Sequence, residues 1–172
     1  APESKFPTQL EDLNLVCKWV MKRAGRFHFD TERIFAVGDS AGAHLLGLYA
    51  GICTNPEYAA RYDFIVPEGF ALTAIALNCG VYQIADADDQ TKEIMKDLLP
   101  NGGTAEELEQ INALNTITDV YPPVYCMTAV ADMLKNQAPA LVEKLMENNV
   151  PFVFRVFGDK VNQLTHVFHC DV

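Results

Sequence analysis

The fold of this chain is decided by residues 33–51, which read RIFAVGDSAGAHLLGLYAG. Residues 33–37 are mostly apolar and lead into a glycine, a pattern that predicts a short strand. A G-x-S-x-G sequence follows at residues 38–42, and apolar residues then recur at helical spacing. The stretch therefore predicts a strand, a tight turn and a helix in immediate succession.

A serine in a tight strand-to-helix turn is the arrangement called a nucleophile elbow, in which a strained backbone exposes the hydroxyl. Glycine suits such a turn, and we expect that a Cβ at Gly38 or at Gly42 would clash with the crowded strand and helix. The alternative is that Gly38–Gly42 is only a flexible loop. The flanking strand and helix favour the elbow, which makes Ser40 the candidate nucleophile.

Composition places the chain among globular proteins and excludes several functions. Its 172 residues are enough for one domain, and 49% of them are hydrophobic. The formal net charge is −10 with no basic cluster, so we expect neither nucleic acid nor a membrane surface as a partner. Five scattered cysteines without C-x-x-C spacing predict reduced thiols in a cytoplasmic protein, and no pattern of metal ligands occurs.

Three further strands are predicted from continuous apolar runs at residues 71–78, 124–130 and 152–157. Such runs are typical of parallel strands that are covered on both faces. An amphipathic helix around residues 141–146 lies between the last two runs. The alternation of strands and helices predicts an α/β fold with a mostly parallel sheet flanked by helices.

Two other segments carry helix signals. Thr8 and Glu11 have the spacing of a capping box, and the helix that they predict should stop at Gly25. Residues 56–69 contain proline and glycine and predict an irregular connection.

Residues 83–118 interrupt the alternation of strands and helices. Two short helices are predicted there, at about residues 91–99 and 105–114, the second with a capping box from Thr104 to Glu107. The segment holds eight acidic residues against two lysines. We interpret it as a helical cap at the carboxyl edge of the sheet, with a solvated pair of surface helices as the alternative.

A serine hydroxyl becomes a good nucleophile when a base takes its proton, and in the elbow architecture the order is serine, acid, histidine. His28 precedes Ser40, and His44 should point along the elbow helix, away from the hydroxyl. His166 and His169 both follow the last predicted strand. We favour His166 as the base because it lies in a loop that passes from polar to apolar residues.

The acid should lie at the carboxyl end of a strand, where α/β sites assemble. Asp132 comes directly after the strand at residues 124–130, although it could instead stabilise the start of the next helix. Asp159 is only seven residues before His166. Asp132 is therefore the preferred acid. The backbone N–H of Ala41 is a candidate oxyanion donor, and residues 1–37 offer no second one.

Together these motifs resemble the hormone-sensitive-lipase-like branch of the α/β-hydrolase esterases. The resemblance rests on Phe6-Pro7, Gly38-Asp39-Ser40-Ala41-Gly42, Tyr121-Pro122-Pro123, Asp132 and His166-Val167-Phe168, which match the family in order and spacing. It implies an α/β-hydrolase fold, and we expect neither a cofactor nor a metal. It also implies that Ser40 is the nucleophile, Asp132 the acid and His166 the base, with the Ala41 N–H in the oxyanion hole.

Members of that family also carry a His-Gly-Gly oxyanion loop on earlier strands and a helix after the catalytic histidine. This sequence contains neither, so we expect a partial catalytic domain, incomplete at both ends. One flank of the sheet should then be uncovered, and these 172 residues alone should be inactive.

The sequence thus predicts a serine carboxylesterase that hydrolyses short-chain acyl esters, acetyl esters above all, through an acyl-enzyme. Its partner would be a small-molecule ester, and a homo-oligomer is left open. One alternative is a non-catalytic protein that binds a ligand on a hydrolase frame. The other is a different acyl hydrolase, such as a thioesterase or a peptidase.

Overall fold

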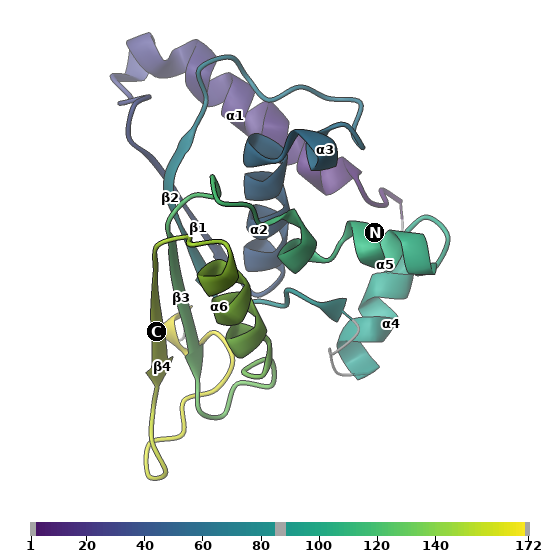
Figure 1. Ribbon diagram of the computed structural model, residues 1–172, viewed down its shortest axis with the longest axis vertical. Coiled ribbons are helices and arrows are strands. Elements are labelled where there is room, and N and C mark those ends of the chain that lie inside the picture. Colours follow the sequence, from purple (N-terminus) through teal and green to yellow (C-terminus); the bar gives the residue numbers. More distant parts are fainter. Residues whose placement is uncertain (1–2, 85–88, 171–172) are drawn as a thin grey trace.

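The computed structural model describes residues 3–84 and 89–170 (Figure 1). Its strands are β1 (Ile34–Asp39), β2 (Leu72–Asn78), β3 (Val124–Ala129) and β4 (Phe152–Phe157). Its α-helices are α1 (Thr8–Phe27), α2 (Ala41–Thr54), α3 (Pro56–Ala59), α4 (Asp89–Leu98), α5 (Ala105–Gln110) and α6 (Gln137–Glu147). Short 3-10 helices in the described part of the chain include η2 (Ala113–Thr116) and η3 (Phe168–Cys170).

The four strands form one parallel sheet in the order β1-β2-β3-β4. Because this order never reverses, right-handed crossovers place the connecting helices on the same face of the sheet. Figure 1 shows α2 and α6 on that face, with α1 packed against α2. The parallel α/β architecture predicted from the sequence is confirmed.

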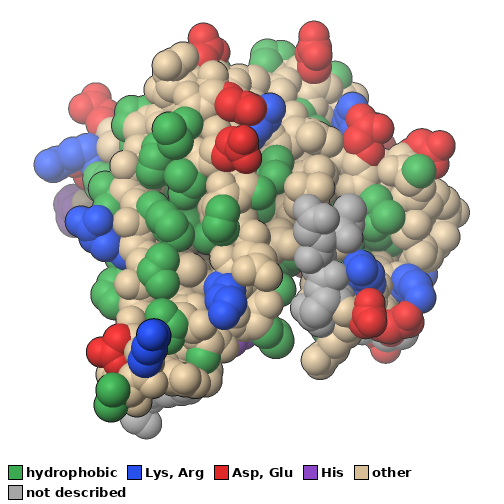
Figure 2. All heavy atoms as spheres, turned by 60° about the horizontal axis from the view of Figure 1, so that its bottom comes forward, with side chains coloured by type: hydrophobic (Ala, Val, Ile, Leu, Met, Phe, Trp, Pro, Cys, Tyr) green, Lys and Arg blue, Asp and Glu red, His purple; other side chains and the backbone are tan. Residues whose placement is uncertain are grey.

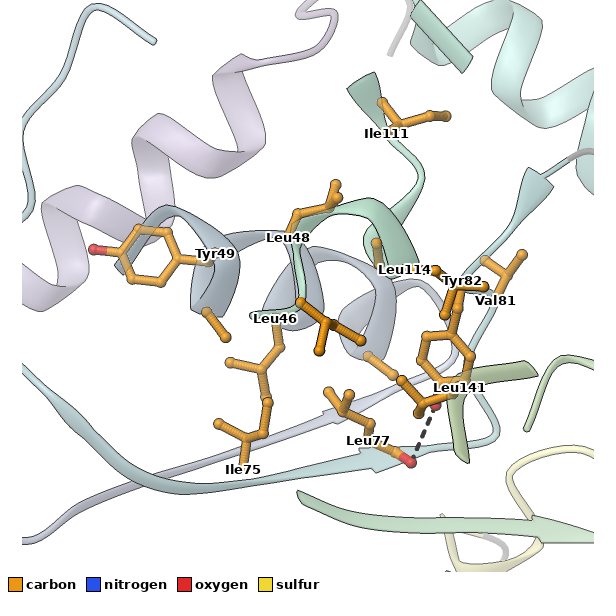
Figure 3. Packing of buried hydrophobic residues seen from close by; sticks show 14 of the residues in the cluster. Leu46, Leu48, Tyr49, Ile75, Leu77, Val81, Tyr82, Ile111, Leu114 and Leu141 are labelled. Carbon is orange, nitrogen blue, oxygen red and sulfur yellow. Dashed lines mark hydrogen bonds between the residues drawn. The ribbon is translucent and has the colours of Figure 1, made fainter. Parts of the chain in front are cut away.

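The hydrophobic core lies between α2 and the sheet (Figure 3). Leu46 and Leu48 of α2 are buried in it together with Ile75 and Leu77 of β2. The hydroxyl of Tyr82, which follows β2, donates a hydrogen bond of 3.2 Å to the backbone oxygen of Leu77. The packing of these buried side chains holds β2 under the helix that begins directly after Ser40.

All four predicted strands are confirmed, whereas the signals for α1 are wrong at both ends. Thr8 lies inside the helix, its side chain makes no capping hydrogen bond, and Pro7 occupies the N-cap. The helix also continues through Gly25 to Phe27, and His28, whose φ is 57°, is its C-cap. The second predicted capping box, between Thr104 and Glu107, is confirmed.

Coverage of the sheet differs between strands. Every side chain of β3 is buried or half-buried, as expected for a strand covered on both faces. The same expectation is wrong for β4, where Val153 is 45% exposed and Val156 54% exposed. The reason is that α2 and α6 cover one face, and Figure 2 shows hydrophobic side chains at the surface over the part of the molecule that holds the sheet.

One connection is more ordered than its sequence indicates, and another contains the two helices predicted for it. Residues 56–69, expected to be irregular, begin with α3, which is capped by a hydrogen bond from the Tyr58 N–H to the Asn55 side chain. In residues 83–118, α4, α5 and η2 follow one another, while residues 85–88 lie outside the described part. Within residues 3–84 and 89–170, no helix combines the length and apolarity needed to cross a membrane.

Candidate active site

The turn between β1 and α2 holds Ser40 in a strained backbone conformation. Its φ of 55° and ψ of −117° lie outside the regions that a residue with a side chain usually adopts. The Ser40 N–H donates a hydrogen bond of 2.9 Å to the backbone oxygen of Asn78, so the pairing of β1 with β2 continues one residue beyond the strand. This contact fixes the backbone of Ser40 at the carboxyl edge of the sheet.

The two glycines of the turn differ in what surrounds them. A Cβ at Gly38 would lie 2.3 Å from the backbone oxygen of Gly42, so the predicted clash is confirmed there. A Cβ at Gly42 would meet no heavy atom within 4 Å, so the predicted clash is wrong at this position. Gly42 is exposed in the first turn of α2, whereas Gly38 lies beneath that turn.

Three side chains from separate segments meet at the carboxyl edge of the sheet. The Ser40 Oγ lies 2.8 Å from the Nε2 of His166, and the Nδ1 of His166 lies 2.8 Å from the Oδ1 of Asp132. An ionised carboxylate can only accept, so Nδ1 carries the ring proton and Nε2 accepts from the serine hydroxyl. Ser40, His166 and Asp132, all selected from the sequence, therefore form one continuous hydrogen-bonded chain.

Asp132, which lies just after β3, is the last residue in this series of hydrogen bonds and is itself held in place by further hydrogen bonds. It is 2% exposed, and it accepts from the Thr128 hydroxyl and from the Leu134 N–H, both at 2.9 Å. Burial raises the pKa of Asp132, but hydrogen bonds from Leu134, His166, Thr128 and Cys79 outweigh it and leave the pKa lowered. The carboxylate is therefore ionised at neutral pH. The helix-capping alternative does not hold, because the N-cap of α6 is Asn136.

The other candidates from the sequence lie elsewhere. His44 is fully buried, and its Nε2 contacts the Ile111 oxygen at 2.7 Å instead of the serine. His28 ends α1. Asp159 is exposed and accepts from backbone N–H groups within its own turn. His169 lies close to the site, with its Nε2 at 2.6 Å from the Oδ1 of Asp39.

Ala41 is the first residue of α2. Backbone N–H groups in the first turn of a helix have no intrahelical partner, and they lie at the positive end of the helix dipole. The Ala41 N–H thus lies beside Ser40 at a place suited to a negatively charged oxygen. The second donor of an oxyanion hole stays a prediction without a residue.

Two groups of potential metal ligands lie near Ser40 in the described part of the chain. Cys79 joins Asp132 and His166, and Cys170 joins Asp39 and His169, with the ligand atoms of each group within 4.8 Å of one another. Two ligands of a tetrahedral zinc ion would lie about 3.3 Å apart. The histidine-to-carboxylate distances of 2.8 Å and 2.6 Å are shorter and fit direct hydrogen bonds.

Cys79 was not selected from the sequence, although it follows β2 at the same edge as Asp132. It is buried, its φ is 48°, and burial above all raises the pKa of its thiol to about 12. The thiol contacts the Asp132 carboxylate and the backbone N–H of Val167. Its position one residue beyond a strand was the available signal.

Comparison with known proteins agrees with this geometry. The chain is 23% identical to an acetyl esterase of Salmonella choleraesuis (strain SC-B67) over an alignment of 180 positions that covers 96% of this chain and 53% of the relative. It is 26% identical to the endo-1,4-beta-xylanase B of Butyrivibrio fibrisolvens over an alignment of 163 positions that covers 91% of this chain and 24% of that protein. Esterase B from Lactobacillus rhamnosis (HN001) superposes with a TM-score of 0.83 at 23% identity, covering 97% of this chain and 55% of that one.

The chain thus spans between a quarter and about half of the length of these proteins. A family model described as an alpha/beta hydrolase fold matches residues 1–170. Since this match covers nearly the whole sequence, the chain belongs to the α/β-hydrolase fold family.

Proposed function

We propose that this chain carries the catalytic centre of a serine carboxylesterase that acts on short-chain acyl esters. The observation that carries the proposal is the unbroken chain of hydrogen bonds from Ser40 through His166 to Asp132. In that chain Ser40 is the nucleophile, His166 the base and Asp132 the acid. Since the 172 residues alone are expected to be inactive, the activity assays are done on the full-length protein that carries them, and this protein is the parent in those assays.

The reaction proceeds in two halves. In the first, the Ser40 Oγ attacks the ester carbonyl carbon while its proton passes to the Nε2 of His166. The carbonyl electron pair moves to the oxygen, which the Ala41 N–H stabilises, and the carboxylate of Asp132 stabilises the imidazolium. When the intermediate collapses, the alkoxide leaves with the proton from His166, and an acyl group remains on Ser40.

In the second half, water attacks the acyl carbon while His166 takes one of its protons. The tetrahedral intermediate then collapses, the proton returns from His166 to Oγ, and the carboxylic acid is released. Neither half requires a cofactor or a metal ion.

Acetyl esters are the favoured substrates because a relative that covers 96% of this chain is named an acetyl esterase. The substrate is a small ester, and residues 83–118 form a cap beside it. We further propose a cytoplasmic location and leave a homo-oligomer open. A thioesterase or peptidase would use the same three residues, and a non-catalytic protein would bind its ligand without covalent reaction at Ser40.

The decisive experiment uses a fluorophosphonate probe, which reacts with activated serines. The chain holds two serines, Ser4 and Ser40, so the matched variants are Ser40→Ala and Ser4→Ala. We expect one adduct by intact mass, mapped to Ser40, in the parent and in Ser4→Ala. Ser40→Ala should show none, and its hydrolysis of p-nitrophenyl acetate should fall by about 10⁴-fold or more.

An adduct at another residue, or undiminished hydrolysis by Ser40→Ala, would refute the proposal. A panel of acetyl, butyryl and octanoyl esters, an acetyl thioester and a peptide anilide then tests the substrate class. Fastest turnover of a substrate other than acetyl or butyryl esters would contradict the choice of short-chain esters.

A further inference from the structure

The residue proposed as the base must be brought across the sheet. Strands β1 and β4 lie at opposite edges, separated by three interstrand spacings, or about 14 Å. Ser40 follows β1, whereas His166 belongs to the segment that follows β4, residues 158–170. This segment, yellow in Figure 1, therefore passes back over the carboxyl ends of β3 and β2 to reach Ser40.

On the side of β3 and β4 this segment is held by backbone and ring contacts. The Leu164 oxygen accepts a hydrogen bond of 3.0 Å from the Ala131 N–H, next to Asp132. The ring of Phe168 packs against Phe157 at the end of β4, with ring centroids 5.4 Å apart. These contacts hold the segment near the acid but do not reach β1.

On the side of β1 the contact is made by a second histidine. The Nε2 of His169 donates to the Oδ1 of Asp39 over 2.6 Å, and Asp39 directly precedes Ser40. The same oxygen accepts a hydrogen bond of 3.0 Å from the Nδ2 of Asn78, a buried residue at the end of β2. Partial burial raises the pKa of Asp39, but the hydrogen bonds from Asn78 and His169 outweigh it and leave the pKa lowered, so the acceptor is ionised.

The two histidines are coupled by a tight stretch of backbone. Val167, between them, has a φ of 49°, a strained value for a β-branched residue. The Cys170 N–H donates a hydrogen bond of 2.8 Å to the backbone oxygen of Val167, and this bond closes the short helix η3. Strained conformations persist when the structure on both sides holds them, and here His166 and His169 are each hydrogen-bonded.

We propose that His169 is a positioning residue whose hydrogen bond to Asp39 fixes the segment carrying His166 against the strand that carries Ser40. The distance between the His166 Nε2 and the Ser40 Oγ is then set from both sides, through Asp132 and through Asp39. The inference rests on the proposed function of Ser40 and His166. It assigns to His169 and Asp39 a role that needs no contact with the substrate.

The test compares His169→Leu, which removes the donor, with His169→Gln, whose side-chain N–H can reach Asp39. Gln163→Leu is the control, because Gln163 is exposed in the same segment. We expect His169→Leu to lower the rate of fluorophosphonate reaction and the kcat for p-nitrophenyl acetate by about 10- to 100-fold with little change in KM. His169→Gln should recover most of the loss, and Gln163→Leu should match the parent.

Asp39→Ala and the double variant with His169→Leu complete a thermodynamic cycle. Because the pair acts as one contact, the two losses should be strongly non-additive. Amide hydrogen exchange of residues 163–170 provides a readout that does not depend on activity, and we expect faster exchange in His169→Leu alone among the single variants at His169 and Gln163.

Three outcomes separate the two proposals. Unchanged exchange and an unchanged rate in His169→Leu would overturn the positioning role while leaving the esterase intact. A loss in His169→Leu that His169→Gln fails to recover would also overturn it, since the role is assigned to the hydrogen bond. A parent that fails to react with the probe would overturn the esterase proposal, and the catalytic consequence of His169 with it.

Discussion

At Gly38, a single hydrogen atom in place of a side chain lets β1 pass beneath the first turn of α2. A Cβ there would lie 2.3 Å from the Gly42 oxygen and 2.7 Å from the Ala43 nitrogen, both of them backbone atoms. Backbone in the first turn of a packed helix cannot retreat as a flexible side chain can. Strand and helix would have to separate at the point where Ser40 is held.

We therefore predict different effects of an alanine substitution at the two glycines of the turn. Gly38→Ala should lower the free energy of unfolding by about 2–3 kcal/mol, as expected for a backbone clash in the core. Gly42→Ala should leave it unchanged or raise it by up to about 1 kcal/mol, since alanine favours a helix over glycine and its Cβ meets nothing. Urea denaturation of both variants is the measurement, and equal effects would show that the turn is not crowded as described.

The sequence identified the three side chains that meet at the site but not those that hold them. Ser40, Asp132 and His166 could be selected because each lies just after a strand or in the loop after the last one, and their order is characteristic. The contact between Asp39 and His169 joins residues 130 positions apart. No periodicity or spacing indicates such a contact, which depends on the path of a loop.

Among the helices, α2 is tied to the segment at residues 83–118 by a buried histidine. His44 lies fully inside the protein, with its Nε2 at 2.7 Å from the Ile111 oxygen at the end of α5. A carbonyl oxygen can only accept, so Nε2 carries the proton and donates. Burial lowers the pKa of His44, although the hydrogen bond to Ile111 raises it in part.

This burial predicts a loss of stability in acid. The folded-state pKa of His44 lies below its unfolded value of about 6.5, so the unfolded chain binds a proton that the folded chain excludes. The contribution is present in full above about pH 6.5 and is lost as the pH falls below it, by up to about 1.4 kcal/mol per pH unit. His44→Gln keeps a donor for Ile111 and should flatten this part of the curve.

The measurement is the free energy of unfolding from pH 4.5 to 7.5 for the parent, for His44→Gln and for the exposed control His28→Asn. Only the curve of His44→Gln should diverge from that of the parent, and the difference should grow toward low pH. Parallel curves for His44→Gln and the parent would mean that His44 is protonated in the folded protein.

Helix boundaries show where sequence patterns stop being sufficient. Thr8 and Thr104 each precede a glutamate by three residues, yet only Thr104 has the extended backbone that a cap requires, with a ψ of 163°. At Thr8 the Pro7 oxygen already accepts from the Leu10 N–H at 2.8 Å, so the helix begins one residue too early for the box. The pattern defines which side chains are present and leaves the backbone angle open.

The predicted end of α1 at Gly25 is wrong for a related reason. Glycine favours a helix stop only weakly, and tertiary contacts override such preferences. Beyond Gly25, Phe27 packs against Trp19 with ring centroids 5.5 Å apart, and Phe29 stacks on Phe27 at 5.4 Å. The contacts within this aromatic cluster stabilise one more turn of helix. They join residues on both sides of Gly25, so the glycine alone does not predict where the helix ends.

At the scale of the whole molecule, the two faces of the sheet differ. The register places Val37, Ala76, Tyr125 and Val153 opposite one another in a row across all four strands. Val37 is 67% exposed and Val153 is 45% exposed. Residues on the other face, such as Ile75, are buried under α2 and α6. Apolar runs predicted the strands correctly, but they do not reveal which of the two faces is covered.

We predict that this row contributes little to the stability of the 172-residue chain. Val37→Thr and Val153→Thr preserve the shape and the β-propensity of valine, so each should change the free energy of unfolding by less than about 0.5 kcal/mol. Ile75→Thr, on the opposite face, buries a hydroxyl and leaves a small cavity, and should cost about 2–3 kcal/mol. The exposed row should also bind the dye ANS, and the double variant at Val37 and Val153 should bind less of it.

The measurements are urea denaturation and ANS fluorescence of the parent and of these four variants. A loss above about 1 kcal/mol in either threonine variant would mean that the row is packed against something in solution. In that case the loss should depend on protein concentration if a second copy of the chain is the cover, because association stabilises by mass action. A loss that is independent of concentration would instead place the cover within the chain itself.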